Sequence, residues 1–293
     1  MNKVKVSACI ITYNQEHYIK DCLDGAVSQV LDFDYEIVIG DDCSTDKTFQ
    51  ICKEYAERYP NKIKLLVRDK NKGMTGNWID TILNCKGKYI ALCEGDDYWI
   101  SSNKLQKQVD FLESNPEYVL SFHRVNVLKR DGAITEDLIT KVPENYESME
   151  AMATFGNYIH TPSVVYRNII SEFPPEFELS PVCDYFLYMM LVQHGKVKYL
   201  KETMAVYRSD IGVMSKMSYI DVHYSEVRFY SCIASHLDDI KIKKIFIDRQ
   251  LPALKKMERI LNVNNKTYFI KKNKILKFAL FLSDKYEKLV KRL

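Results

Sequence analysis

The 293-residue sequence predicts an α/β fold: a Rossmann-like, mixed but mostly parallel sheet flanked by helices, followed by a C-terminal helical extension. Three observations predict it. Four apolar, β-rich runs alternate with three segments of helical periodicity over residues 4–93, as in a doubly wound sheet. The strict alternation ends after residue 98, and from about residue 216 onward the pattern is helical.

The first half of the chain contains the regular alternation. Asn14 is a candidate N-cap for the first helix, and Ser44 or Thr45 is a candidate N-cap for the second. Strands joined by helices in this way pair in parallel. We therefore expect a helix between each pair of successive strands, with the strands at 4–11, 36–40, 62–67 and 88–93.

The second half predicts a mixed α+β arrangement and then helices. The expected elements are a helix over 102–115, strands at 118–129 and 160–167, a buried helix over 182–195, and two short strands at 197–200 and 204–208. We expect one domain over residues 1–215, with halves of about 1–98 and 99–215. A basic helical extension over 216–293 follows it.

Cysteine usage and the N-terminus predict a cytoplasmic protein. The eight cysteines are scattered through apolar runs without a CxxC pair, a pattern typical of reduced thiols rather than of a disulfide framework or a zinc site. The first apolar run is too short and too poorly flanked for a signal peptide or a membrane span. We expect the protein to stay inside the cell.

The C-terminal segment is strongly basic. Residues 255–293 hold twelve Lys or Arg against three Asp or Glu. Within residues 271–293 the apolar positions recur on one helical face, which predicts contact with an anionic membrane surface on the inner face of the cell membrane. Packing of the same helix on the body or on a second subunit is the open alternative.

Polar clusters follow three of the predicted strands. They are Thr12-Tyr13-Asn14, Asp41-Asp42 and Glu94-Gly95-Asp96-Asp97. Ligands of open α/β sheets bind outside the carboxyl ends of the strands, so we expect these clusters to converge. The acidic pairs suit Mg²⁺ or Mn²⁺ beside a phosphorylated ligand, because these hard cations prefer oxygen ligands. The alternative is that both pairs are turn residues that cap the next helix.

The order of these motifs resembles a known family. ACIITYN, EIVIGDDCSTDKT, NKG, GKYIALCEGDDYW, CDYFLYMMLVQHG and MAVYR together resemble the family 2 inverting glycosyltransferases of GT-A fold, over about residues 4–215. The resemblance implies transfer of a sugar from a nucleotide diphosphate donor, usually a UDP-sugar, to an acceptor hydroxyl with inversion. The acceptor would be a saccharide or a lipid-linked saccharide in bacterial surface polysaccharide synthesis.

The resemblance also implies roles for residues at the strand ends. It makes residues 1–98 the nucleotide-binding half and 99–215 the acceptor half. Asp97 would bind the Mn²⁺ or Mg²⁺ ion, which stabilises the departing diphosphate. Asp42 would contact the uracil, and Asp96 the ribose or diphosphate. The remaining nucleotide-binding positions are Thr12, Tyr13 and Asn14.

On the acceptor side, Asp184 matches the general base that takes the proton from the acceptor hydroxyl. An acid stabilised by the helix dipole is the structural alternative for this position. Trp99 would stack on a sugar and His160 would line the acceptor site, although both also suit half-buried structural positions. Glu94 and Arg208 are further candidates for sugar contacts. Asp210 stands where many relatives have a histidine.

Two other functions remain open at this point. A sugar nucleotidyltransferase uses a similar sheet with metal-binding acids, but ITYNQEHYIK lacks its glycine-rich loop. A non-catalytic module that binds a sugar nucleotide or nucleic acid is the other alternative. We expect no nucleic-acid partner, because the body is acidic and the basic tail lacks aromatic residues arranged for base stacking.

Overall fold

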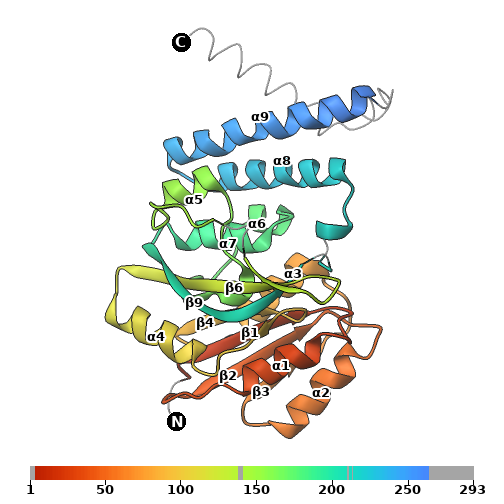
Figure 1. Ribbon diagram of the computed structural model, residues 1–293, viewed down its shortest axis with the longest axis vertical. Helices are drawn as coiled ribbons and strands as arrows, with labels where there is room; N and C mark the ends of the chain where they lie inside the picture. The colour runs from red at the N-terminus through yellow and green to blue at the C-terminus, as the bar shows by residue number, and fades with distance from the viewer. Residues whose placement is uncertain (1–3, 138–140, 210, 213, 264–293) are drawn as a thin grey trace. The chain divides into compact units, whose positions relative to one another are not determined.

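The computed structural model describes residues 4–137, 141–209, 211–212 and 214–263 (Figure 1). The segment 271–293, with its predicted membrane contact, lies outside these residues. The chain divides into two compact units. The first comprises Met1–Leu179 and Cys183–Lys216, and the second Ser180–Val182 and Met217–Leu293. In the described part of the chain, no helix has both the length and the apolar character needed to cross a membrane.

A mixed sheet forms the centre of the first unit, in the order β3-β2-β1-β4-β8-β6-β9-β5, with β7 paired to β6. Strands β3, β2, β1 and β4 are parallel, whereas β8 runs antiparallel to both β4 and β6. The predicted α/β class is confirmed. The strands are β1 (Val6–Thr12), β2 (Tyr35–Asp41), β3 (Ile63–Leu66), β4 (Tyr89–Glu94), β5 (Tyr98–Trp99), β6 (Tyr118–Leu128), β7 (Ile134–Glu136), β8 (Val165–Arg167) and β9 (Lys196–Arg208).

Helices cover both faces of this sheet. Ala8 and Ile10 of β1 belong to one core with Leu23 and Leu105, whereas Cys9 borders Trp78 on the other face. This alternation is what a strand buried on both faces requires. The helices of the unit are α1 (Ile19–Val27), α2 (Thr48–Arg58), α3 (Gly73–Leu83), α4 (Lys104–Ser114), α5 (Met149–Phe155), α6 (Pro175–Leu179) and α7 (Cys183–Leu191), with short 3₁₀ turns η1 (Thr161–Ser163) and η2 (Met214–Lys216).

The second unit contains two long helices, α8 (Tyr219–His236) and α9 (Ile240–Val263). Ser218 caps α8, because its hydroxyl accepts a hydrogen bond from the Asp221 N–H. Val227 of α8 packs against Leu254 and Met257 of α9 in a small core of this unit.

Four local predictions were wrong. Residues 160–167 form the turn η1 and only then the short strand β8, and the two short strands expected at 197–208 are one strand, β9. Asn14 does not cap α1: it has a positive φ of 52°, and its side-chain oxygen accepts the Thr45 N–H at 2.8 Å. Neither Ser44 nor Thr45 caps α2, whose first N–H instead bonds to the Asp46 carboxylate.

A lysine is buried between β5 and the start of α4. The Lys104 side chain is fully buried, with Nζ 4.4 Å from the ring centroid of Trp99. Its ammonium has no hydrogen-bond partner among the described residues. Burial lowers the pKa of Lys104 from 10.5 to about 7.

This burial predicts a pH-dependent stability. The unfolded chain holds the Lys104 proton up to about pH 10.5 and the folded chain only to about pH 7, so the free energy of unfolding should rise with pH between these values. In the wild type, Lys104 should raise the free energy of unfolding by about 3 to 5 kcal/mol between pH 6 and pH 10, and Lys104→Met should lose this rise. Urea denaturation across this range measures it. Lys107→Met, on an exposed lysine of the same helix, is the control, and an equal pH dependence in all three proteins would contradict the prediction.

Candidate active site

The ends of β1, β2 and β4 bring the predicted polar clusters together. Thr12 lies opposite Asp41 in the β1–β2 pairing, and Ile11 lies opposite Glu94 in the β1–β4 pairing. Because the three strands are adjacent and parallel, their carboxyl ends share one edge of the sheet. The expected convergence of these clusters is confirmed.

The β2 side of this edge is built from buried polar contacts. The Asp42 N–H donates to the Thr12 carbonyl at 3.0 Å, and Asp42 Oδ1 accepts the Lys72 N–H at 2.7 Å. Thr12 and Asp42 are each 3% exposed, whereas Tyr13 is 47% exposed. Asn14 joins this loop to Ser44 and Thr45. Tyr13 and Asn14 are therefore the exposed members of this group, and Tyr13 is the one with an aromatic ring.

Three carboxylates follow β4. One oxygen each from Glu94, Asp96 and Asp97 lies within 4.8 Å of the other two. Gly95 lets the loop lie against β1, since a Cβ there would come within 2.7 Å of Thr12 Oγ1. The chain thus holds three acids together at the tip of one buried strand.

Arg208 forms hydrogen bonds to this loop. Its N–H donates to Asp97 Oδ1 at 2.7 Å, and its guanidinium donates to the Asp96 carbonyl and to the Asp21 carboxylate. The guanidinium lies 4.7 Å from the ring centroid of Tyr98 and 5.1 Å from that of Tyr18. With 9% exposure and these contacts, Arg208 holds the acidic loop in place, and its expected contact with a sugar stays a prediction.

The acidic loop favours a cation. Burial raises the pKa of all three carboxyl groups, and Asp96 and Asp184 add to the increase at Glu94. Asp97 Oδ2 is buried without a hydrogen-bond partner among the described residues. An orphaned buried oxygen beside two further carboxylates fits the oxygen-rich ligand set of Mg²⁺ or Mn²⁺.

Asp184 reaches the same region from the first turn of α7. Its Oδ1 accepts the Tyr185 N–H at 2.7 Å, and its Oδ2 accepts the Asn157 side-chain amide at 2.8 Å. Burial raises the pKa of Asp184, while these two hydrogen bonds lower it. A partly buried carboxylate with a raised pKa is suited to accepting a proton.

His160 is close enough to Asp184 for its positive charge, when protonated, to lower the pKa of this carboxylate, although burial and the hydrogen bonds have larger effects. Its Nε2 is 2.8 Å from Asp137 Oδ2, and its ring centroid is 4.6 Å from that of Tyr207. The His160 side chain keeps 20% exposure. It is therefore partly open to solvent.

Trp99 is more enclosed than His160. It is 4% exposed, and its indole N–H donates to the Pro162 carbonyl at 2.9 Å. Lys104 Nζ lies over its ring, and the expected stacking of Trp99 on a sugar stays a prediction. Trp99 fixes the turn η1, which directly follows His160.

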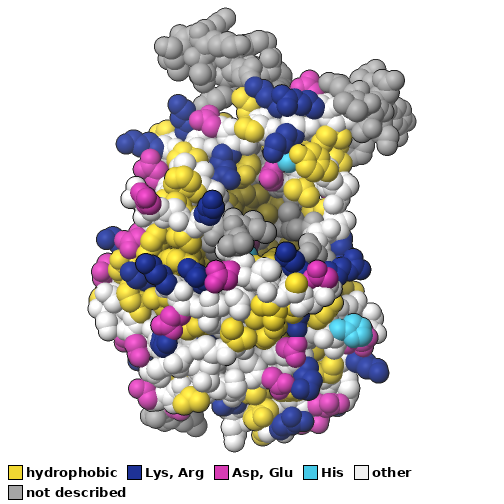
Figure 2. Space-filling model, in the orientation of Figure 1, with side chains coloured by type: hydrophobic (Ala, Val, Ile, Leu, Met, Phe, Trp, Pro, Cys, Tyr) yellow, Lys and Arg dark blue, Asp and Glu magenta, His cyan; other side chains and the backbone are white. Residues whose placement is uncertain are grey.

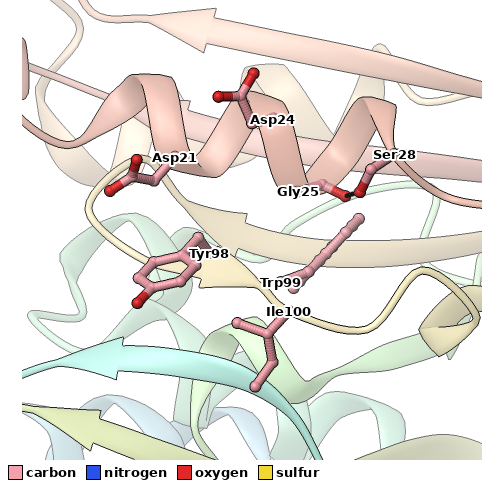
Figure 3. A pocket seen from close by; sticks show the side chains of 7 residues that line it. All are labelled: Asp21, Asp24, Gly25, Ser28, Tyr98, Trp99 and Ile100. Carbon is pink, nitrogen blue, oxygen red and sulfur yellow. Dashed lines mark hydrogen bonds between the residues drawn. The ribbon is translucent and has the colours of Figure 1, made fainter. Parts of the chain in front are cut away.

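An open cleft of about 500 Å³ lies between α1 and β5 (Figure 3), and the three acids are not among its lining residues. Figure 3 shows Asp21 and Asp24 projecting from α1 on one side of it. Asp21 forms an ion pair with Arg208, the residue that holds the acidic loop. One wall of the cleft is therefore connected to that loop through Arg208. Its lining residues are Asp21, Asp24, Gly25, Ser28, Tyr98, Trp99 and Ile100.

Sequence reasoning missed Asn157 and Tyr207. Burial and the nearby acids Asp97 and Glu94 raise the pKa of Tyr207, which places this ring at the site. The dipeptide Gly156-Asn157 was a local signal for the end of a helix and a change in chain direction, because glycine commonly follows the last helical residue. No local pattern marks Tyr207, whose place depends on the pairing of β9 with β6.

Comparisons with known proteins agree with this architecture. Residues 7–173 match the family model described as glycosyl transferase family 2. The chain is 40% identical over 203 residues to the uncharacterized protein Rv1520 of Mycobacterium tuberculosis, a match that covers 69% of this chain and 58% of that protein. It is 38% identical over 114 residues to the poly(ribitol-phosphate) beta-glucosyltransferase of Bacillus spizizenii, covering 38% and 18% respectively. The chain thus spans less than two thirds of either relative.

A solved structure shares the fold. TarS of S. aureus in complex with UDP-GlcNAc superimposes with a TM-score of 0.60 at 18% identity, covering 85% of this chain and 72% of that one. The structural likeness supports the predicted GT-A fold, and the family model matches more than half of the sequence. The chain belongs to glycosyl transferase family 2.

Proposed function

We propose that this chain is a metal-dependent, inverting glycosyltransferase that moves a sugar from a nucleotide diphosphate donor, a UDP-sugar, to an acceptor hydroxyl. One observation supports this proposal above the others. Three carboxylates gather at the end of β4, beside the ends of β1 and β2, and a fourth from α7 faces the same region. A divalent metal ion would offset the negative charge both of this cluster and of a donor's diphosphate.

The β1 and β2 ends form the nucleotide side of the proposed site. Tyr13 would border the base with its exposed ring. Thr12 and Asn14 would shape the loop beneath it. Asp42 would contact the uracil after a small movement that exposes its buried carboxylate. Glu94, which is partly exposed, would face the donor.

The metal would be held by Asp96 and Asp97 together. The sequence alone favours Asp97, and its unpartnered Oδ2 supports that assignment. However, Asp97 is 1% exposed and its Oδ1 is taken by Arg208, whereas Asp96 is partly exposed. We therefore extend the ligand set to Asp96. When bound, Mg²⁺ or Mn²⁺ would stabilise the negative charge that develops on the departing diphosphate.

The acceptor side would supply the base. Asp184 would take the proton of the acceptor hydroxyl. At the same time the acceptor oxygen would attack the anomeric carbon of the donor sugar, and the bond from that carbon to the diphosphate would break. Attack from the face opposite the leaving group inverts the anomeric centre. His160, held by Asp137, would line the acceptor site.

The acceptor is proposed to be a saccharide or a lipid-linked saccharide in bacterial surface polysaccharide synthesis. The relative named as a poly(ribitol-phosphate) beta-glucosyltransferase supports a polymer acceptor. The TarS complex with UDP-GlcNAc supports a hexosyl or N-acetylhexosaminyl donor. We propose that residues 1–215 carry out the transfer inside the cell, and that residues 271–293, outside the described part of the chain, contact the membrane surface.

The two other functions have weaker support. Basic and acidic side chains are interspersed over the described residues on the face shown in Figure 2, whereas a nucleic-acid-binding surface is predominantly basic. A sugar nucleotidyltransferase would need a glycine-rich loop after β1, where the chain has YNQEHYIK.

Screening of UDP-sugars for turnover tests the proposal. The protein is incubated with each donor, with Mn²⁺, with Mg²⁺ or with EDTA, and release of UDP is measured. We expect release from at least one donor with a metal and none with EDTA. Pyrophosphate release from a nucleoside triphosphate and a sugar 1-phosphate, without UDP release, would instead identify a nucleotidyltransferase.

A further inference from the structure

The side-chain amide of Asn157 contacts the carboxylate that we assign as the base. We propose that Asn157 is a positioning residue for Asp184: it fixes the orientation of this carboxylate and stabilises its charged form for proton transfer. This inference rests on the proposed function, because it concerns how the same site acts on its acceptor. The argument depends on how the chain places Asn157, how its amide is oriented, and which charges surround Asp184.

The end of α5 places Asn157 at the start of α7. Helix α5 ends at Phe155, and Gly156 has a φ of 89°, which residues with a side chain rarely adopt. The Gly156 N–H donates to the Met152 carbonyl at 3.1 Å, and the Tyr185 hydroxyl donates to the same carbonyl at 2.6 Å. Because Tyr185 follows Asp184 directly, this contact fastens the two segments together.

The amide of Asn157 has one orientation. Its Oδ1 accepts the Ile159 N–H at 3.1 Å, so its Nδ2 points the opposite way, to Asp184 Oδ2 at 2.8 Å. A flipped amide would lose the first contact and place its oxygen against a carboxylate oxygen. Asp184 Oδ1 accepts the Tyr185 N–H, so each carboxylate oxygen has a donor. Together these contacts fix the plane of the carboxylate.

The surroundings of Asp184 make this donor important. Glu94 and the ionisable side chains of Cys183, Tyr188 and Tyr207 interact with its charge, and His160 would stabilise that charge when protonated. Burial is the largest effect and disfavours the charged form. The neutral amide favours the charged form without adding a titrating group.

The test replaces the donor and follows pH dependence. In Asn157→Ala the acidic limb of kcat/KM for the acceptor should move up by about one pH unit, since a hydrogen bond to a charged group is lost. In Asn157→Asp the shift should be larger, because a second carboxylate would lie against the first. The KM for the donor should stay unchanged. Asn157 is exposed, so both variants should fold.

A control and a second readout separate the outcomes. Asn103→Ala, at an exposed asparagine before α4, should leave the profile unchanged. The Asp184 carboxyl is also titrated by ¹³C NMR in the wild type and in Asn157→Ala, a measurement that needs no turnover. We expect a higher pKa for Asp184 in the variant. An unmoved Asp184 titration overturns this inference, whereas absent turnover with a shifted titration overturns the proposed function alone.

Discussion

Asp184→Asn is expected to reduce transfer to the acceptor by a factor of about 10² to 10⁴, the usual contribution of a general base. The amide keeps the size of the carboxylate and can still accept the Tyr185 N–H, but it cannot take the acceptor proton. The acceptor oxygen would then have to attack while still protonated. The acids after β4 are untouched by the change, so binding of UDP with Mn²⁺ should stay the same.

Two measurements check this expectation: the rate of transfer, and the rise in melting temperature produced by UDP with Mn²⁺. Asp131→Asn serves as the control, because Asp131 is an exposed turn residue whose carboxylate accepts the Ala133 N–H. Transfer at the wild-type rate in Asp184→Asn would remove Asp184 from the mechanism. Loss of UDP binding would show that it acts on the donor instead.

Asp96→Asn and Asp97→Asn are each expected to raise the Mn²⁺ concentration for half-maximal UDP release by about tenfold or more. Each change removes one negative charge from an oxygen ligand set, which weakens binding of a hard cation. The two variants should differ in stability. Asp97 is buried and its carboxylate accepts the Arg208 N–H, whereas the hydrogen bond from Arg208 to Asp96 goes to the backbone carbonyl.

Titration of activity with Mn²⁺, together with thermal denaturation, separates these roles. Asp96→Asn should keep the wild-type melting temperature while losing metal affinity. Asp110→Asn, on the exposed side of α4, provides the matched control. If both variants kept the wild-type requirement for Mn²⁺, the acidic loop would not be the metal site.

The parallel half of the fold could be predicted from local patterns. Strands β1 to β4 are apolar runs separated by helices, and this alternation leaves few ways of pairing them. The second half could not be predicted as closely. Strand β9 pairs with β6 and β5 across gaps in the sequence, so its polar middle, Lys201 to Thr203, breaks the local pattern without ending the strand.

The candidate site divides in the same way. The convergence of Thr12, Asp42 and Glu94 follows from the fold class alone, because adjacent parallel strands end at one edge. The burial of Trp99 and Arg208 depends on partners about 60 and 110 residues away, Pro162 and Asp97. Sequence spacing does not report such contacts, so neither of them could be predicted.

The anomeric configuration of the released sugar shows whether the displacement inverts or retains the anomeric centre. A UDP-sugar with an α linkage is hydrolysed by the protein with Mn²⁺, and the first sugar formed is recorded by ¹H NMR before mutarotation. An inverting site, with attack from the face opposite the diphosphate, predicts that the β anomer appears first. Initial release of the α anomer would contradict single displacement assisted by Asp184.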